Sequence, residues 1–193
     1  EINKKLVVDM ATQGKQIIPE IDDALVDNFS YDYEVVSTEE ALYEPIDGHD
    51  KMFKGFIDAV IKTSDGKYHI VDWKTCSWGW NAKKRSEAIT TYQLTLYKHF
   101  WCQKHNVDPS IVETHFALLK RTAKNDKVEF FRPTSGPRKT ANALELLHKA
   151  LKNIDHVICS SKNTQKELVE YYNFDLKYNQ QSEQQCISFI NEK

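Results

Sequence analysis

The sequence predicts an α/β fold in which helices cover strands that are apolar on both faces. Two runs rich in Ile, Val and aromatic residues flank a Ser-Asp-Gly turn and predict an antiparallel hairpin over residues 55–75. Apolar side chains recur at helical spacing over residues 86–105. Residues 112–119 and 128–131 read as a second hairpin. Strands that are apolar on both faces lie inside a domain, so helices are expected on each side of them.

Length and composition are typical of one globular domain spanning residues 1–193, with its core motifs in 35–100 and a hairpin and helices in 112–175. No segment approaches a membrane span or a signal peptide, which favours a cytoplasmic protein of a bacterium or a virus-infected host cell. The net charge is −2, so contact with nucleic acid requires a local basic patch. The four cysteines have no paired short spacing, which argues against disulfides and cysteine zinc sites.

The register of the first hairpin brings two acids together. If residues 64–66 form a three-residue loop, Thr63 faces Lys67 and Asp58 lies opposite Asp72. Side chains in such a pair have Cβ atoms roughly 5 Å apart. Alternation along the strand puts Lys74 on the same face as Asp72.

A buried carboxylate pair needs a compensating cation, because two like charges this close cannot both stay ionised alone. Hard oxygen ligands point to Mg²⁺ or Mn²⁺. The structural alternative is an ion pair between Asp72 and Lys74, with Asp58 capping a turn. A third acid would come from the extended segment 33–46, where Glu39 and Glu40 point to opposite faces and only one can look inward.

Basic and aromatic side chains gather in two further places. The loop after Thr75 combines indole rings with cations, a composition suited to stacking unpaired bases and contacting phosphates: Trp78, Trp80, Lys83, Lys84 and Arg85. The second hairpin carries Lys120 and Arg121 in the densest positive cluster of the chain. The alternatives are that the indoles plug the end of the sheet and that the hairpin is a solvated tip.

Three further helices are expected. One lies within residues 4–29 with Pro19 in its first turn, one follows Pro137, and a short one opens at the capping box Thr164–Glu167 and ends near residue 172. In the helix over 86–105, Ile89 belongs to the apolar stripe, and Gln93 and Tyr97 lie one turn apart on one side.

The order of these motifs resembles the RecB-like branch of the PD-(D/E)XK nuclease superfamily, found in phage and bacterial exonucleases. The matching elements are an acid on an extended segment, Gly55-Phe-Ile-Asp58, Asp72-Trp-Lys74-Thr75, and Tyr92-Gln93 with Tyr97. The resemblance implies a restriction-endonuclease-like core, a central mixed β-sheet flanked by α-helices. It also implies that Asp58, Asp72, the Trp73 carbonyl and Glu39, with Glu40 second, bind the metal.

In relatives of this kind Lys74 would orient or deprotonate the attacking water, while Gln93 and Tyr97 would touch substrate and brace the site. The resemblance therefore implies a metal-dependent deoxyribonuclease that hydrolyses phosphodiester bonds, more an exonuclease than an endonuclease. Expected partners are single-stranded DNA or duplex ends, a larger recombination or replication complex, or a second copy of the chain, and no membrane. The competing hypothesis is a nucleic-acid-binding protein that keeps the fold and has lost cleavage.

Overall fold

The described part of the chain contains a five-stranded sheet and four α-helices. The computed structural model describes the backbone of residues 4–160 and the side chains of residues 4–153. The elements in chain order are α1 (Lys4–Phe29), β1 (Glu34–Pro45), β2 (Met52–Lys62), β3 (Tyr68–Cys76), α2 (Ala82–Ser86), α3 (Ala88–His105), the 3-10 turn η1 (Pro109–Ile111), β4 (Val112–Lys120), β5 (Val128–Phe131) and α4 (Pro137–Ser160). The expected helix near 164–172 lies outside the described residues.

The chain divides at Leu144, inside α4, into two compact units. The first unit, through Leu144, holds the sheet with α1, α2 and α3. Most of the second unit lies beyond the described residues, so the expectation of a single domain stays a prediction. Among residues 4–160, no helix combines the length and the apolar character that a membrane crossing requires.

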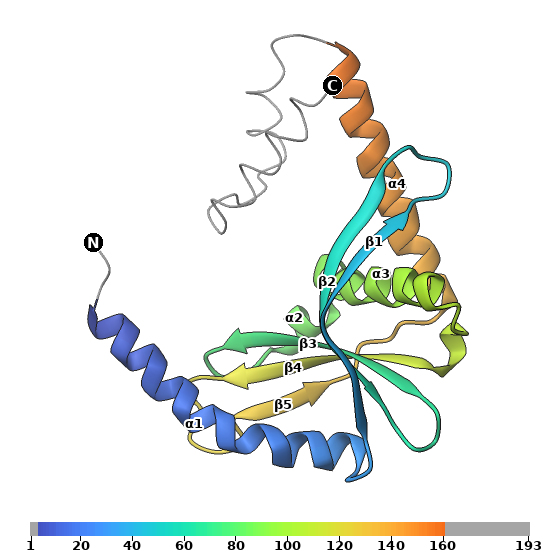
Figure 1. The fold of residues 1–193 in the computed structure, drawn as a ribbon. Helices are drawn as coiled ribbons and strands as arrows, with labels where there is room; N and C mark the ends of the chain where they lie inside the picture. The colour runs from blue at the N-terminus through green and yellow to red at the C-terminus, as the bar shows by residue number, and fades with distance from the viewer. Residues whose placement is uncertain (1–3, 161–193) are drawn as a thin grey trace. The chain divides into compact units, whose positions relative to one another are not determined.

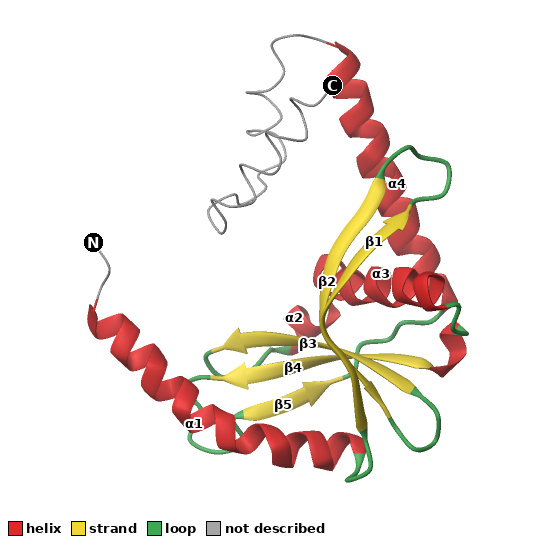
Figure 2. Ribbon diagram, viewed as in Figure 1, coloured by secondary structure: helices red, strands yellow, loops and turns green. Residues whose placement is uncertain are grey.

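The sheet is mixed, as the sequence resemblance implies. Its strand order is β1-β2-β3-β4-β5, and every neighbouring pair is antiparallel except β3 and β4. The parallel pair is connected by α2 and α3, a crossover that parallel strands require. Helices lie on both sides of the strands (Figure 2). The predicted α/β fold with a restriction-endonuclease-like core is therefore confirmed.

The first hairpin has the predicted register. The Thr63 N–H donates to the Lys67 carbonyl at 3.0 Å, and Gly66 takes the left-handed conformation (φ 83°) that this turn requires. Pairing of β2 with β3 then runs from Lys62 to Ala59 and stops there. Beyond this point β2 continues with β1 and bends away from β3 (Figure 1). The two strands therefore separate next to Asp58.

Opposite faces of the sheet meet different helices. On one face, Leu25 and Phe29 of α1 pack with Val71 and Ala117 in a buried apolar cluster. On the other face, the Trp101 ring of α3 lies 5.1 Å from the ring of Tyr68 between centroids. Because side chains alternate along β3, Asp72 and Lys74 share the α3 face with Tyr68.

Three local expectations are wrong. α1 is continuous from Lys4, so Pro19 lies inside the helix rather than in its first turn. The loop after Thr75 contains α2, whose N-terminus is capped by Asn81. Ile89 is 77% exposed and does not belong to the buried stripe of α3. Buried threonines extend that stripe instead, because their hydroxyls donate to carbonyls of the preceding turn, as Thr95 does to Thr91 at 3.0 Å.

A polar network fastens the C-terminal end of α3 to β1. The Glu40 carboxylate, 10% exposed, lies at its centre and accepts from the Lys104 ammonium at 2.8 Å. The other partners of this carboxylate are Ser37, Trp101 and His105. Burial alone would raise the pKa of Glu40, but the hydrogen bonds outweigh burial and lower the pKa to about 2.

Glu40→Gln is expected to lower the free energy of unfolding by about 1–2 kcal/mol at pH 7, allowing for the partial exposure of the network. Because the pKa of Glu40 is lower in the folded chain, this stabilisation is present above about pH 4.5 and is lost as the pH falls toward 2. Urea unfolding at pH 7, 5 and 3 measures it. The exposed Glu34, replaced by Gln, is the control on the same strand. A difference between wild type and Glu40→Gln that stays constant down to pH 3 contradicts the prediction.

Candidate active site

The point where β2 and β3 separate holds the two predicted acids. Asp72 is 2% exposed, and Asp58 is half-buried on the adjoining strand. The Trp73 N–H donates to Asp58 Oδ2 at 2.7 Å. The Asp58 side chain thus binds the backbone of β3 just past the last regular strand pair, Ala59–Val71. This bond fixes one carboxylate oxygen of Asp58 beside Asp72.

The Asp72 carboxylate is short of compensating charge. Its Oδ2 atom forms an ion pair with Lys74 Nζ at 2.8 Å. The geometry of this pair is not that of a hydrogen bond, and among the described residues this buried oxygen has no hydrogen-bond partner. Burial raises the pKa of Asp72 although Lys74 opposes this, and the charge of Asp58 raises the pKa further. One lysine therefore does not offset the two carboxylates. A hard divalent cation fits this set of oxygen donors.

Two side chains of α3 reach the same carboxylate. Gln93 Nε2 lies 3.3 Å from Asp72 Oδ1 and 3.0 Å from the Tyr97 hydroxyl. The spacing of four residues puts Gln93 and Tyr97 one helical turn apart, as the sequence predicts. The structure thus brings Asp58, Asp72, Lys74, Gln93 and Tyr97 together.

Gly55 lets α3 approach β2 closely enough for this contact. A Cβ atom at position 55 would lie 2.7 Å from Tyr97 Cε1, closer than Cβ atoms come to other atoms, and would make a tight contact of 3.3 Å with Phe53 Cε1. A glycine at this position therefore leaves room for the Tyr97 ring, and through Tyr97 it supports the position of the Gln93 amide.

The two glutamates of β1 have different surroundings. The pairs Thr38–Ala59 and Glu40–Ile57 leave Glu39 opposite Asp58 in the register. Glu39 is exposed and takes a positive φ of 49°, which interrupts the regular pleat of β1. The Glu40 carboxylate is instead engaged by the α3 network. Glu39 is thus the acid of this pair that register puts beside Asp58.

The aromatic and basic residues after β3 divide into exposed and engaged groups. Trp78 is 70% exposed, whereas the Trp80 ring lies 5.0 Å from the Phe116 ring between centroids and packs on the sheet. Lys83 is exposed, and Lys84 pairs with Glu87 at 2.5 Å. Trp78 and Lys83 are therefore the side chains of this loop most available to a ligand.

Glu129 of β5 pairs with two of the residues predicted to contact nucleic acid, a role that no sequence pattern indicates. Its carboxylate pairs with Arg85 and, at 3.3 Å, with Lys120. Arg121 is half-buried, and its backbone N–H donates to the Cys76 carbonyl at 2.8 Å. These contacts attach the β4–β5 turn to the segment that follows the acidic site.

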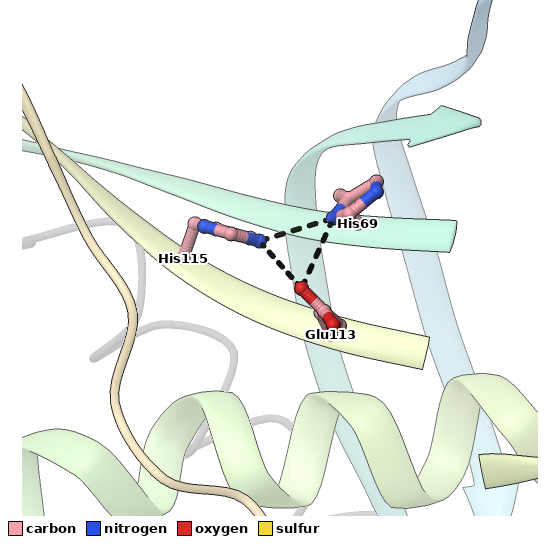
Figure 3. Close-up of side chains that lie close together, drawn as sticks. All are labelled: His69, Glu113 and His115. Atoms are coloured by element: carbon pink, nitrogen blue, oxygen red, sulfur yellow. Dashed lines mark hydrogen bonds and ion pairs between the residues drawn. The ribbon is translucent and has the colours of Figure 1, made fainter. Parts of the chain in front are cut away.

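A second polar cluster was also missed. His69, Glu113 and His115 lie close together on β3 and β4 (Figure 3). Their spacing in the sequence contains no metal-binding pattern, because the cluster arises from the parallel pairing of strands that are separated by two helices. Sequence periodicity cannot supply that register.

Solved structures resemble the fold at low sequence identity. A crystal structure named "Putative exonuclease" from Eubacterium rectale has a TM-score of 0.52 and 14% identity, covering 74% of this chain and 52% of its own. The crystal structure of SSO0001 has a TM-score of 0.41 and 18% identity, covering 74% of this chain and 60% of its own. This chain thus spans about half to three fifths of those structures. The curated proteins include no match.

The sequence itself matches a family model. The model describes the PD-(D/E)XK nuclease superfamily and covers residues 14–184, most of the chain. Its name denotes acids followed by a lysine two positions on, the pattern that Asp72 and Lys74 form here. With the mixed sheet and the acidic site, the match shows that this chain belongs to the PD-(D/E)XK nuclease superfamily.

Proposed function

We propose that this nuclease is a metal-dependent deoxyribonuclease of the RecB-like branch that hydrolyses phosphodiester bonds as an exonuclease, on single strands or duplex ends. The observation that supports it most directly is the buried Asp72 carboxylate, which faces Lys74 Nζ at 2.8 Å and neighbours Asp58. A buried acid beside a second acid is costly to the fold, and such arrangements occur mainly where chemistry needs them.

Mg²⁺ or Mn²⁺ would be held by Asp58, Asp72 and the Trp73 carbonyl, with Glu39 as the proposed further ligand. When bound, the ion lowers the pKa of a water molecule and offsets charge that develops on the phosphate. Glu40 was the second candidate from the sequence for this role. Its carboxylate is paired with Lys104 and bonded to the neighbours of that lysine, so Glu40 is not among the proposed ligands.

The protein's own groups have separate roles around the phosphate. The Lys74 ammonium orients the attacking water and donates to phosphate oxygens. The Gln93 amide donates its two N–H groups to Asp72 and to the Tyr97 hydroxyl, which keeps the carboxylate in one orientation and leaves the Tyr97 O–H proton to donate to substrate. The Trp73 N–H holds Asp58 in place.

Single-stranded DNA fits the exposed loop next to this site. An unpaired base can stack on the Trp78 ring, and the exposed Lys83 can meet a phosphate. The name of the Eubacterium rectale structure agrees with an exonuclease role. Assembly into a recombination or replication complex, or into a homo-oligomer, stays a prediction from sequence.

The alternative of a binding protein without activity is disfavoured by the same acids. A protein that only binds DNA gains from positive charge near phosphates, and buried carboxylates at the contact would repel the backbone. Incubation of labelled linear DNA with Mg²⁺ distinguishes the two functions: products support the nuclease, and intact DNA despite binding supports the alternative.

Asp72→Asn is expected to raise the melting temperature in EDTA by roughly 2–4 °C, because it removes a buried charge that the site does not compensate. Excess Mg²⁺ should then stabilise the wild type and leave Asp72→Asn almost unchanged. Scanning calorimetry with and without Mg²⁺ measures both effects. Asp22→Asn, an exposed acid of α1, should respond to Mg²⁺ as the wild type does. Equal stabilisation of all three proteins would remove Asp72 from the metal site.

Asp72→Asn and Lys74→Ala are each expected to slow cleavage of labelled DNA by at least ~100-fold, since one loses a metal ligand and the other the group that orients water. Circular dichroism should show native helix content in both. Lys67→Ala, a lysine of the hairpin turn paired with Asp65, should cleave normally. Cleavage at the wild-type rate in either active-site variant would locate the chemistry elsewhere.

Trp78→Ala should weaken binding of single-stranded DNA by roughly 5- to 100-fold, the range for losing one stacked base. Binding to blunt duplex should change less, because its internal bases are already stacked. Fluorescence anisotropy in the presence of Ca²⁺ or EDTA gives both affinities. Tyr31→Ala, which removes another exposed aromatic ring, is the matched control. An equal loss on both kinds of DNA would assign Trp78 to packing of its loop.

A further inference from the structure

The cluster of His69, Glu113 and His115 lies on the sheet face opposite to the active site. His69 follows the odd-numbered alternation of β3 with Val71, on the face that α1 covers, whereas Asp72 lies on the α3 face. The parallel register pairs His69 with Glu113 and Val71 with His115. Two imidazoles and a carboxylate therefore meet between neighbouring strands (Figure 3).

Three donor atoms of the cluster have the spacing of metal ligands. His69 Nδ1 lies 3.1 Å from His115 Nε2 and 3.8 Å from Glu113 Oε2. His115 Nε2 lies 3.9 Å from the same oxygen. A tetrahedral Zn²⁺ with bonds of about 2.0–2.1 Å needs donors roughly 3.4 Å apart. Shifts of a few tenths of an ångström would bring all three atoms into that geometry.

Burial of both imidazoles favours their neutral form, which is the form that binds metals. Both rings are buried, with exposed fractions of 7% for His69 and 8% for His115, and the Phe29 ring packs against them at 4.9 and 5.2 Å between centroids. Burial lowers the pKa of His69 although the charge of Glu113 opposes this, and burial lowers the pKa of His115 to about 3.

A second layer of contacts orients His69. Thr63 Oγ1 lies 3.1 Å from His69 Nε2 and donates its proton to Asp65 Oδ1 at 2.5 Å. The Lys67 carbonyl, at 3.4 Å, is the other acceptor for the same proton. With either acceptor the Thr63 oxygen can only accept from Nε2–H of His69, so the lone pair of Nδ1 faces the cluster. Metal-binding histidines are commonly fixed in this way through their second nitrogen.

One cation competes for the site. Arg132 Nη1 lies 2.7 Å from Glu113 Oε2, the oxygen that faces the imidazoles. The Arg132 side chain is 62% exposed, and Glu113 has a second oxygen that can keep the guanidinium. Glu113 is 22% exposed, so solvent reaches this side of the cluster and can supply a fourth ligand.

We propose that His69, Glu113 and His115 form a second metal site, which binds a divalent transition metal such as Zn²⁺ with water as the fourth ligand. Nitrogen donors prefer this class of ion, whereas the all-oxygen active site prefers Mg²⁺ or Mn²⁺. The metal would join β3 to β4 behind the active site. The alternative is a bare hydrogen bond between the two histidines, with Glu113 paired only with Arg132.

The test is titration of the full-length protein, stripped with a chelator, with Zn²⁺ and with Co²⁺. We expect the wild type to bind the metal at this site and to melt roughly 5–10 °C higher at about 100 times the dissociation constant. Co²⁺ should give the strong visible absorption of tetrahedral coordination. Glu113→Gln keeps the shape of its side chain and should weaken binding at least ~10-fold, as should His69→Gln.

Two further variants separate this site from the active site. Thr63→Val leaves all three ligands in place and should weaken Zn²⁺ binding by about 10-fold, because His69 loses its orientation. Asp72→Asn should bind Zn²⁺ as the wild type does, whatever its cleavage activity. Wild-type binding no tighter than that of Glu113→Gln, or a Co²⁺ spectrum unchanged in His69→Gln, would overturn the second site. If Glu113→Gln fails to fold, the Zn²⁺ affinity of Thr63→Val still tests the site, because this variant keeps all three ligands.

Discussion

The hydrogen bond from the Trp73 N–H to the Asp58 carboxylate determines where the two acids of the candidate active site can meet. At this point β2 leaves β3 while it stays paired with β1, and a backbone donor of β3 would otherwise lose its partner. The side chain of Asp58 supplies the acceptor at 2.7 Å. The sheet can therefore open without an unsatisfied N–H, and the opening holds the second acid at a fixed place beside Asp72.

Strand β3 presents different chemistry on its two faces. Asp72 and Lys74 point toward α3, where Gln93 and Tyr97 complete a site of oxygen donors and hydrogen-bond donors. His69 points toward α1, where aromatic rings enclose it. The alternation of a single strand thus separates a hard-ligand site from a nitrogen-rich one by the thickness of the sheet. A side chain of β3 could move from one site to the other only if the strand shifted its register by one residue.

Short sequence patterns predicted the features that depend on interactions between residues close together in the chain. The turn at residues 64–66 fixes the register of its hairpin, so the neighbouring positions of Asp58 and Asp72 and the side of Lys74 followed from the sequence. Helical spacing likewise placed Gln93 over Tyr97. The resemblance to a nuclease family supplied the proposed chemistry of these residues, and the family match confirms the superfamily.

Contacts between segments that lie far apart in the sequence could not be predicted from it. Ile89 belongs to an apolar stripe by spacing, but tertiary packing buries the threonines of α3 and leaves Ile89 exposed. The ion pairs of Glu129 depend on the β4–β5 register and on the loop after β3, which no periodicity relates. The His69 cluster depends in the same way on parallel pairing across a crossover.

The ion pairs of Glu129 reduce the positive charge near the candidate active site, an effect that the composition of the chain does not show. Because its single carboxylate pairs with both Arg85 and Lys120, one of these two positive charges is already offset by the protein. A nucleic acid strand that met this pair would therefore displace fewer counterions than it would at two unpaired cations, so this part of its affinity would depend less on ionic strength. Contacts that do not rely on charge would then contribute a larger share of any binding at this point.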